Sequence, residues 1–141
     1  MVQALELFAH GVSSEGSFQG CDIRIRYVGD RWARPAIEAF ARLGWRAAQH
    51  DLQARLEFFS LQRESHEGVF IEEIPHGWQG ELVQRLLAAS FQGLRPKGIL
   101  FIGFREHPVA AVLAWLRQAG FEALQQGQSE GLQAVLARRL G

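Results

Sequence analysis

The sequence predicts an α/β fold: a Rossmann-like, mostly parallel sheet with helices on both faces. The first observation is the run Ile99–Phe104, which has almost no polar alternation and is typical of a strand buried on both faces. The second is that amphipathic segments, with apolar residues at helical spacing, precede and follow this run. The third is the alternation of strand and helix candidates along the chain, which favours parallel strands joined by right-handed crossovers.

The bulk properties of the chain indicate a single domain over residues 1–141. The 15 basic residues balance 15 acidic ones, so no net charge favours nucleic acid or anionic lipid as a partner. The single cysteine, Cys21, excludes an internal disulfide and fits a reducing compartment. The N-terminal stretch MVQALELFAHG has no basic region and no long apolar run. We therefore expect a cytoplasmic protein without a signal peptide or a membrane anchor.

The N-terminal half contains short candidate elements. Ala4–Phe8 is an expected strand, and Ile23–Val28 is another because its apolar and charged residues alternate strictly. A helix is expected over Arg34–Leu43, because its proline fits the first turn and a glycine follows its last residue. Leu56–Leu61 is expected to form a strand at an edge of the sheet.

The C-terminal half has the more regular pattern. Helices are expected over Glu81–Leu94 and Pro108–Ala119, because both carry apolar residues at helical spacing. The strands expected there are Val69–Ile74, Ile99–Phe104 and Phe121–Leu124. The last segment, Leu132–Leu140, fits either a final strand or a final helix.

Two long segments of this half follow a recognisable order. Residues 69–104 contain the strand VFIEEI, a helix, the turn LRPKG and the strand ILFIGF. Residues 109–139 contain a helix, the strand AGFE and the final segment. This order resembles the fourth strand to the last strand of the class I S-adenosylmethionine-dependent methyltransferases. The resemblance implies that the cofactor, S-adenosylmethionine, would lie at the carboxyl ends of the first strands.

The resemblance also implies a set of cofactor-binding residues. The first strand would run into a glycine-rich loop that approaches the cofactor, with Gly11 and Gly16 as its glycines. Asp30, at the end of the next strand, would bind the ribose hydroxyls, and Gln62, at the end of the third, would stand near the adenine. Only SFQGCD separates the loop from the next strand, so the family's helix after the first strand is expected to be missing.

The loop after the fourth strand carries the candidate substrate pocket, formed by Glu73, His76 and Trp78. A carboxylate at this strand end could take part in acid–base chemistry. Only one of Glu72 and Glu73 can face a pocket, because neighbouring strand residues point to opposite faces. The plain alternative is a salt bridge, a solvated loop histidine and a partly buried tryptophan.

The cofactor candidates have plain structural alternatives as well. Gly11 and Gly16 fit ordinary turns, and Asp30 fits a cap of the helix that follows it. The five histidines show neither HxxxH nor HxH spacing, so no metal site is expected. Cys21 belongs to no motif and is expected to be a small buried residue rather than a nucleophile.

Two arginines are unexpected on a core strand. Arg24 and Arg26 occupy a face that should be apolar in a sheet covered on both sides. If the covering helix is missing, this face is open, and Glu6 on the neighbouring strand could pair with them. The alternative is that the strand with these arginines lies at an edge of the sheet. An open face would be covered by a second copy of the chain or by a protein partner.

These observations favour a methyltransferase-like domain with an eroded cofactor site that acts through protein–protein contacts. One alternative is an active small S-adenosylmethionine-dependent methyltransferase, with an acceptor that the sequence does not name. A second is a pseudo-receiver signalling domain, to which a final helix would belong. Whether Leu132–Leu140 is a strand or a helix separates the methyltransferase-like fold from the receiver-like one.

Overall fold

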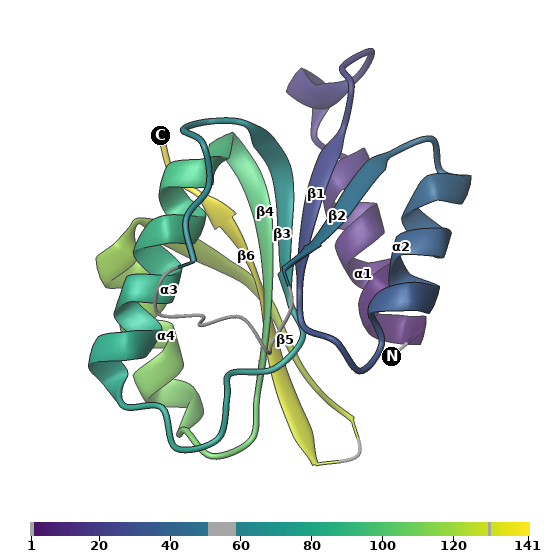
Figure 1. The fold of residues 1–141 in the computed structure, drawn as a ribbon. Coiled ribbons are helices and arrows are strands. Elements are labelled where there is room, and N and C mark those ends of the chain that lie inside the picture. Colours follow the sequence, from purple (N-terminus) through teal and green to yellow (C-terminus); the bar gives the residue numbers. More distant parts are fainter. Residues whose placement is uncertain (1, 51–58, 130) are drawn as a thin grey trace.

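The computed structural model describes residues 2–50, 59–129 and 131–141. In this part of the chain, a six-stranded sheet lies between α1 and α2 on one face and α3 and α4 on the other (Figure 1). The helices are α1 (Val2–Ser13), the short 3₁₀ helix η1 (Gly16–Phe18), α2 (Ala33–Arg42), α3 (Gly80–Gly93) and α4 (Val109–Ala119). The strands are β1 (Arg24–Val28), β2 (Arg46–His50), β3 (His66–Ile71), β4 (Leu94–Phe104), β5 (Phe121–Ser129) and β6 (Leu132–Arg139).

The strand order is β2-β1-β3-β4-β6-β5. β1 pairs in parallel with β2 and β3, β3 pairs in parallel with β4, and β6 runs antiparallel between β4 and β5. The predicted mostly parallel α/β sheet is therefore confirmed. The last segment is a strand, so the methyltransferase-like alternative holds and the receiver-like one, which needs a final helix, is wrong.

The expected strand at Ala4–Phe8 is wrong, because these residues lie in α1. Phe8 and Val12 stand one helical turn apart and both are buried against the sheet. The Phe8 ring lies edge-on to that of Phe70 on β3, with the ring centroids 5.3 Å apart. Since α1 is a helix, Glu6 belongs to no ladder and the cross-strand pairing expected for it is wrong.

This correction changes which strand is the first one. β1 is the first strand of the described chain, and α2 follows it directly. The helix that was expected to be missing after the first strand is therefore present. β2, which the sequence did not predict, follows α2 and lies beside β1 in parallel register, with Arg24 opposite Arg46.

The remaining expected elements agree with the structure to within three residues, except in three places. The strand expected at Phe121–Leu124 is longer and forms β5, Phe121–Ser129. β4 begins at Leu94 and so includes the LRPKG segment, which was expected to be a turn; Lys97 there has a φ of 70°. The first half of the expected strand Leu56–Leu61, residues 56–58, lies outside the described residues. Phe59 and Leu61 are described, belong to no strand and are buried in the core.

The core consists of two apolar clusters separated by the sheet. α3 and α4 pack over one face, where Val28, Val69 and Leu100 are buried. α1 and α2 pack over the other, where the rings of Phe70 and Phe101 stack at a centroid distance of 4.2 Å. Within the described ranges, no helix is long and apolar enough to cross a membrane.

Candidate cofactor site

A buried glutamate connects the carboxyl ends of the two central parallel strands. Glu72 directly follows β3, is 6% exposed, and its backbone N–H donates to the Val28 carbonyl at the end of β1 (2.9 Å). One carboxylate oxygen, Oε2, accepts a hydrogen bond from the hydroxyl of Tyr27 and another from the backbone N–H of Trp32 (3.1 Å). The first strand, its loop and the next helix are therefore held by one side chain that directly follows β3.

The carboxylate of Glu72 lies at the N-terminus of α2. Trp32 is the N-cap residue of that helix, and its own side chain makes no capping hydrogen bond. Negative charge at this end of a helix is favoured, because the first N–H groups are unpaired and the helix dipole is positive there. Glu72 thus supplies the cap that the local sequence lacks.

Tyr27 is fully buried beside this carboxylate. Burial, followed by the hydrogen bond and the negative charge of Glu72, raises the pKa of the Tyr27 phenol far above its ordinary value. Tyr27 therefore remains protonated and acts only as a hydrogen-bond donor here.

Gly29 is the one position of this loop at which glycine is required. Its φ is 147°, and a Cβ placed there would approach Glu72 Cβ to 2.7 Å. The peptide groups of Gly29 are also bonded: its N–H donates to the His50 carbonyl (3.2 Å), and its carbonyl accepts from Gln49 Nε2 (2.8 Å). The close approach that this glycine permits is to Glu72 itself.

The predicted glycine loop is not where the resemblance placed it. Gly11 lies inside α1, where a Cβ would meet Leu136 and Ile99 at 3.4 and 3.5 Å, and Gly16 begins η1. The prediction placed both glycines in a loop after the first strand, and this placement is wrong because the segment before Gly16 is the helix α1. The loop that does follow the first strand contains a single glycine, Gly29.

Asp30 and Gln62 lie at opposite ends of the sheet. Asp30 is exposed and follows β1, hence the first strand rather than the second. Gln62 lies in the loop before β3, where its carbonyl accepts a hydrogen bond from Ser65 Oγ (2.6 Å). Gln62 therefore stands at the amino end of the strands, and the structure does not bring it together with Asp30.

The three predicted substrate-pocket residues do lie together, in the loop between β3 and α3. They face the loop between β4 and α4: Glu73 pairs with Arg105 (3.2 Å), and the exposed His76 pairs with Glu106. The carbonyl of Trp78 lies 2.7 Å from His107 Nε2. These contacts agree with the plain alternative of salt bridges and a partly buried tryptophan.

The sequence pattern did not single out Tyr27 or the strand β2, and it favoured Glu73 over Glu72 as the carboxylate of the pocket. A strand after Gly44 would have placed an acidic residue, Asp51, directly after the second strand, which is the position that the resemblance gives to the ribose ligand. The alternation in RAAQH is weak, so this signal was faint. Asp51 itself lies outside the described residues.

Two further predictions concern metal and thiol chemistry. Among residues 2–50, 59–129 and 131–141, no group of three or more His, Cys, Asp or Glu side chains could hold a metal ion. Cys21 is exposed, so its expected burial is wrong. Its Sγ lies 3.6 Å from the Ser17 carbonyl at the amino edge of the sheet.

Comparison with known proteins identifies the fold. No protein-family model matches the sequence, and no curated protein matches it. Solved structures do match. A Burkholderia thailandensis 1,6-didemethyltoxoflavin-N1-methyltransferase, whose structure holds S-adenosylhomocysteine, superposes with a TM-score of 0.71 at 13% identity, over 98% of this chain and 79% of that one.

Two other methyltransferases give the same result. An S-adenosylmethionine-dependent methyltransferase from Mesorhizobium loti has a TM-score of 0.63 and 15% identity, over 83% of this chain and 91% of that one. An S-adenosylmethionine-dependent methyltransferase from Methanosarcina mazei has a TM-score of 0.58 and 12% identity, over 84% of this chain and 93% of that one. The chain therefore has the fold of the class I S-adenosylmethionine-dependent methyltransferases over nearly its whole length.

Proposed function

We propose that this chain is a methyltransferase-like domain whose cofactor position is closed by its own side chains and which acts through protein–protein contacts. One observation carries the proposal: the carboxylate of Glu72 occupies the N-terminus of α2, where it accepts from Trp32 N–H and the Tyr27 hydroxyl. In open α/β sheets this crevice at the carboxyl ends of the strands is where a ligand binds.

Glu72 and a cofactor would compete for the same space and the same hydrogen-bond donors. A cofactor that approached this loop would need free N–H groups and a gap beside glycine. Here the Trp32 N–H is bonded, and the space beside Gly29 holds the Glu72 side chain. Displacing Glu72 would leave a buried carboxylate and a buried phenol without their partners, which costs more than an ordinary hydrogen bond is worth.

Calorimetric titration with S-adenosylmethionine and S-adenosylhomocysteine tests this half of the proposal. We expect no saturable heat from the wild-type chain or from Glu73→Gln, a matched variant at the half-buried neighbour of Glu72. The Burkholderia enzyme, whose structure contains S-adenosylhomocysteine, is the positive control for the assay. Saturable binding by the wild-type chain at micromolar ligand would contradict the closed site.

A second candidate function is favoured by a specific observation. α2 follows the first strand, so the helix whose absence would have disabled the site is present, and Asp51 follows β2 in the sequence. These features suit an active small S-adenosylmethionine-dependent methyltransferase. The same titration decides between the two, because methyl transfer requires the cofactor to bind.

The contact half of the proposal rests on the edge strand β5. β5 is nine residues long and ends the strand order, and the side chain of Leu124 on it is 41% exposed. A long edge strand offers unpaired backbone groups to another chain. We expect a second copy to pair there, so light scattering should show a dimer that Leu124→Lys weakens. Leu43→Lys, at the exposed C-cap residue of α2, is the control and should leave the dimer unchanged. A monomer at high concentration would exclude self-association.

A further inference from the structure

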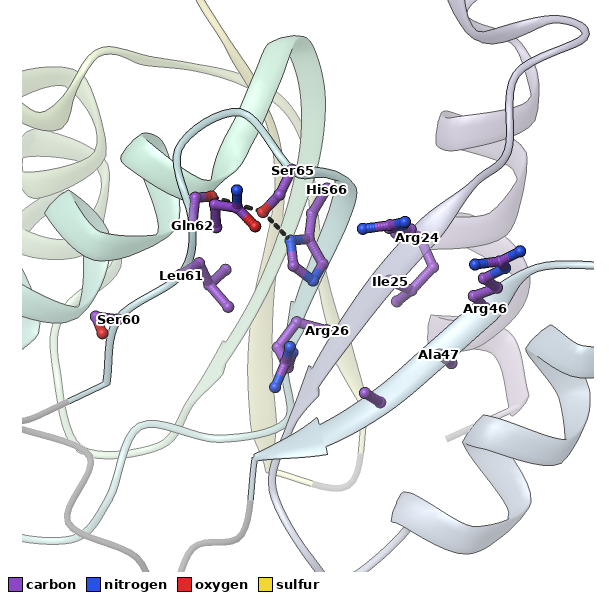
Figure 2. A pocket seen from close by; sticks show the side chains of 11 residues that line it. Arg24, Ile25, Arg26, Arg46, Ala47, Ser60, Leu61, Gln62, Ser65 and His66 are labelled. Atoms are coloured by element: carbon purple, nitrogen blue, oxygen red, sulfur yellow. Dashed lines mark hydrogen bonds between the residues drawn. The ribbon is translucent and has the colours of Figure 1, made fainter.

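A pocket of about 380 Å³ opens at the amino ends of β1, β2 and β3, at the opposite end of the strands from Glu72. We call it the arginine pocket, because Arg24, Arg26 and Arg46 line it together with His66 (Figure 2). The strand register explains the cluster: Arg24 is opposite Arg46 in the β1–β2 pair, and Arg26 follows two residues later on the same face. A pocket of this size falls in the range that small-molecule ligands occupy, roughly 300–1,000 Å³.

The charges of this pocket are of one sign. Among the described residues that line it, three are arginines and none is acidic. Arg46 is paired at the surface with Asp22 (3.2 Å), so the uncompensated charge belongs to Arg24 and Arg26. The pocket therefore has a positive potential that no neighbouring carboxylate in the described chain neutralises.

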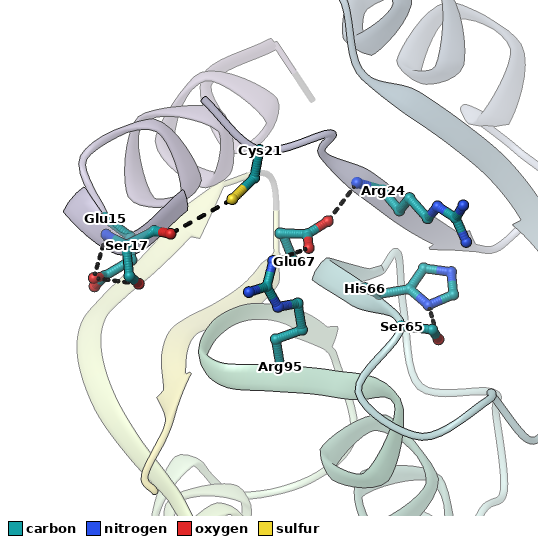
Figure 3. A network of polar contacts seen from close by, with 8 residues as sticks. All are labelled: Glu15, Ser17, Cys21, Arg24, Ser65, His66, Glu67 and Arg95. Carbon is teal, nitrogen blue, oxygen red and sulfur yellow. Dashed lines mark hydrogen bonds and ion pairs between the residues drawn. The ribbon is translucent and has the colours of Figure 1, made fainter. Parts of the chain in front are cut away.

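The nearest buried carboxylate, Glu67, is already fully engaged (Figure 3). Its Oε1 accepts from the backbone N–H of Arg24 (2.6 Å), and its Oε2 accepts from Arg95 Nη1 (3.1 Å). Glu67 therefore binds the backbone N–H of Arg24 and makes no ion pair with the Arg24 guanidinium.

Arg26 is the less exposed of the two arginines. Its Nε is buried and has no hydrogen-bond partner within the described part of the chain. Burial alone lowers the pKa of the Arg26 guanidinium, so the protein pays to hold this charge without an opposing one. An anion in the pocket would supply both the missing acceptor and the missing charge.

His66 adds a hydrogen-bond acceptor to these donors. Ser65 Oγ donates to the Gln62 carbonyl (2.6 Å) and lies 2.7 Å from His66 Nδ1, so Nδ1 must carry the proton that joins these two side chains. Burial and the charges of Arg26 and Arg24 lower the pKa of His66 to about 4, so the ring is neutral at pH 7. Its Nε2 is then an acceptor beside two guanidinium groups.

We propose that the arginine pocket binds the phosphate group of a small molecule, with Arg24 and Arg26 donating to its oxygens and His66 Nε2 accepting a hydrogen bond from its P–OH group. A hydrogen phosphate presents acceptors and a donor at once, whereas a carboxylate presents acceptors only. The mixed donor and acceptor lining therefore favours phosphate over a simple carboxylate. This site lies apart from the position at the carboxyl ends of the strands and is independent of the function proposed above.

Calorimetric titration of the full chain with inorganic phosphate, at constant ionic strength set with chloride, tests the proposal. We expect saturable binding that Arg26→Gln and Arg24→Gln each weaken about tenfold or more, as expected for loss of a hydrogen bond to a charged group. Arg34→Gln is the matched control, because Arg34 is exposed on α2 and pairs only locally with Glu38 (3.7 Å). It removes the same charge and should leave the affinity unchanged.

Two further arms of the titration identify the ligand class. Tighter binding of ribose 5-phosphate than of inorganic phosphate would support a phosphorylated small molecule, and equal binding would support free phosphate. Acetate that binds as tightly as phosphate would overturn the assignment. The proposal also fails if phosphate does not bind at tens of millimolar, or if Arg24→Gln and Arg34→Gln weaken binding equally. Arg24 is exposed, so its variant keeps the test valid even if Arg26→Gln folds poorly.

Discussion

The hydroxyl of Tyr27 on β1 and the backbone N–H of Trp32 at the start of α2 donate to the same carboxylate oxygen of Glu72. These three groups come from the first strand, the following helix and the end of β3, so a single buried oxygen fixes the crevice at the carboxyl ends of the strands. The same β1–β3 pair is joined at its amino end by a second buried carboxylate, Glu67. Glu72 and Glu67 therefore stabilise opposite ends of the same strand pair, and the effect of each on the free energy of unfolding can be measured separately.

Tyr27→Phe should destabilise the fold without changing its shape. The variant removes one of the two hydrogen bonds that the Glu72 Oε2 accepts, from the Tyr27 hydroxyl and the Trp32 N–H, and a buried carboxylate that loses a partner costs about 1–3 kcal/mol. Urea unfolding followed by circular dichroism measures the loss. An unfolding free energy equal to that of the wild-type chain would show that the Tyr27 hydroxyl does not stabilise Glu72.

Gly29→Ala should be destabilising for a different reason. The φ of 147° is unfavourable for alanine, and the new Cβ would stand 2.7 Å from Glu72 Cβ. We expect a loss of about 1–3 kcal/mol from backbone strain alone. Gly16→Ala is the control, because nothing lies within 4 Å of a Cβ at that position. Equal melting temperatures for the two variants would contradict this reading of the loop.

Glu67→Gln should loosen the amino end of the sheet. Glu67 is 3% exposed and binds both the N–H of Arg24 and the guanidinium of Arg95, whose pKa it raises chiefly through that hydrogen bond. Losing the charge should cost about 1–3 kcal/mol in urea unfolding. Glu122→Gln breaks an exposed pair with Arg138 and should cost less than about 1 kcal/mol. A larger loss of unfolding free energy for Glu122→Gln than for Glu67→Gln would show that Glu67 does not connect β1 to β4.

His66 should make stability depend on pH between about 6.5 and about 4. Its pKa is lowered in the folded state by burial and by Arg26 and Arg24, so the unfolded chain takes up the proton first as the pH falls. Above a pH of about 6.5, His66 is neutral in both states and does not lower the free energy of unfolding. As the pH falls through this window, the free energy of unfolding decreases by up to about 3 kcal/mol. The groups that face His66 are Arg24, Arg26 and the bonded Ser65.

NMR titration of the His66 ring measures this directly. Arg26→Gln should raise the pKa of His66, because it removes one of the two charges that lower it. His66→Gln should remove this part of the acid destabilisation. A His66 pKa near 6.5 in the wild-type chain would contradict both the burial of the ring and its place beside the arginines.

The C-terminal half was predictable because its signals are long and local. Ile99–Phe104 and the stripes of α3 and α4 each specify one kind of element, and the structure contains all three. Ala4–Phe8 was mistaken for a strand because five residues do not distinguish a helical period from a strand period. β2 was missed because RAAQH is mostly exposed, with the burial of an edge strand.

The site could not be predicted for a different reason. Glu72 reaches Tyr27 and Trp32 only because β1 and β3 pair with Val28 opposite Ile71, and no local pattern specifies that register. Arg24 and Arg26 were recognised as misplaced on a covered strand, but the pocket that accommodates them depends on β2, which was not expected. Both sites therefore depend on strand pairing between distant segments. The local sequence indicated only that two arginines were unusual on a covered strand.

The central claim is that Glu72 closes the cofactor position at the N-terminus of α2. Nitrogen-15 NMR of the wild-type chain, titrated with excess S-adenosylhomocysteine, tests it at the atoms concerned, because the amides of Trp32 and Gly29 report on that position. We expect the amide signals of Trp32 and Gly29 to keep their chemical shifts. Saturable shifts of both signals would contradict it.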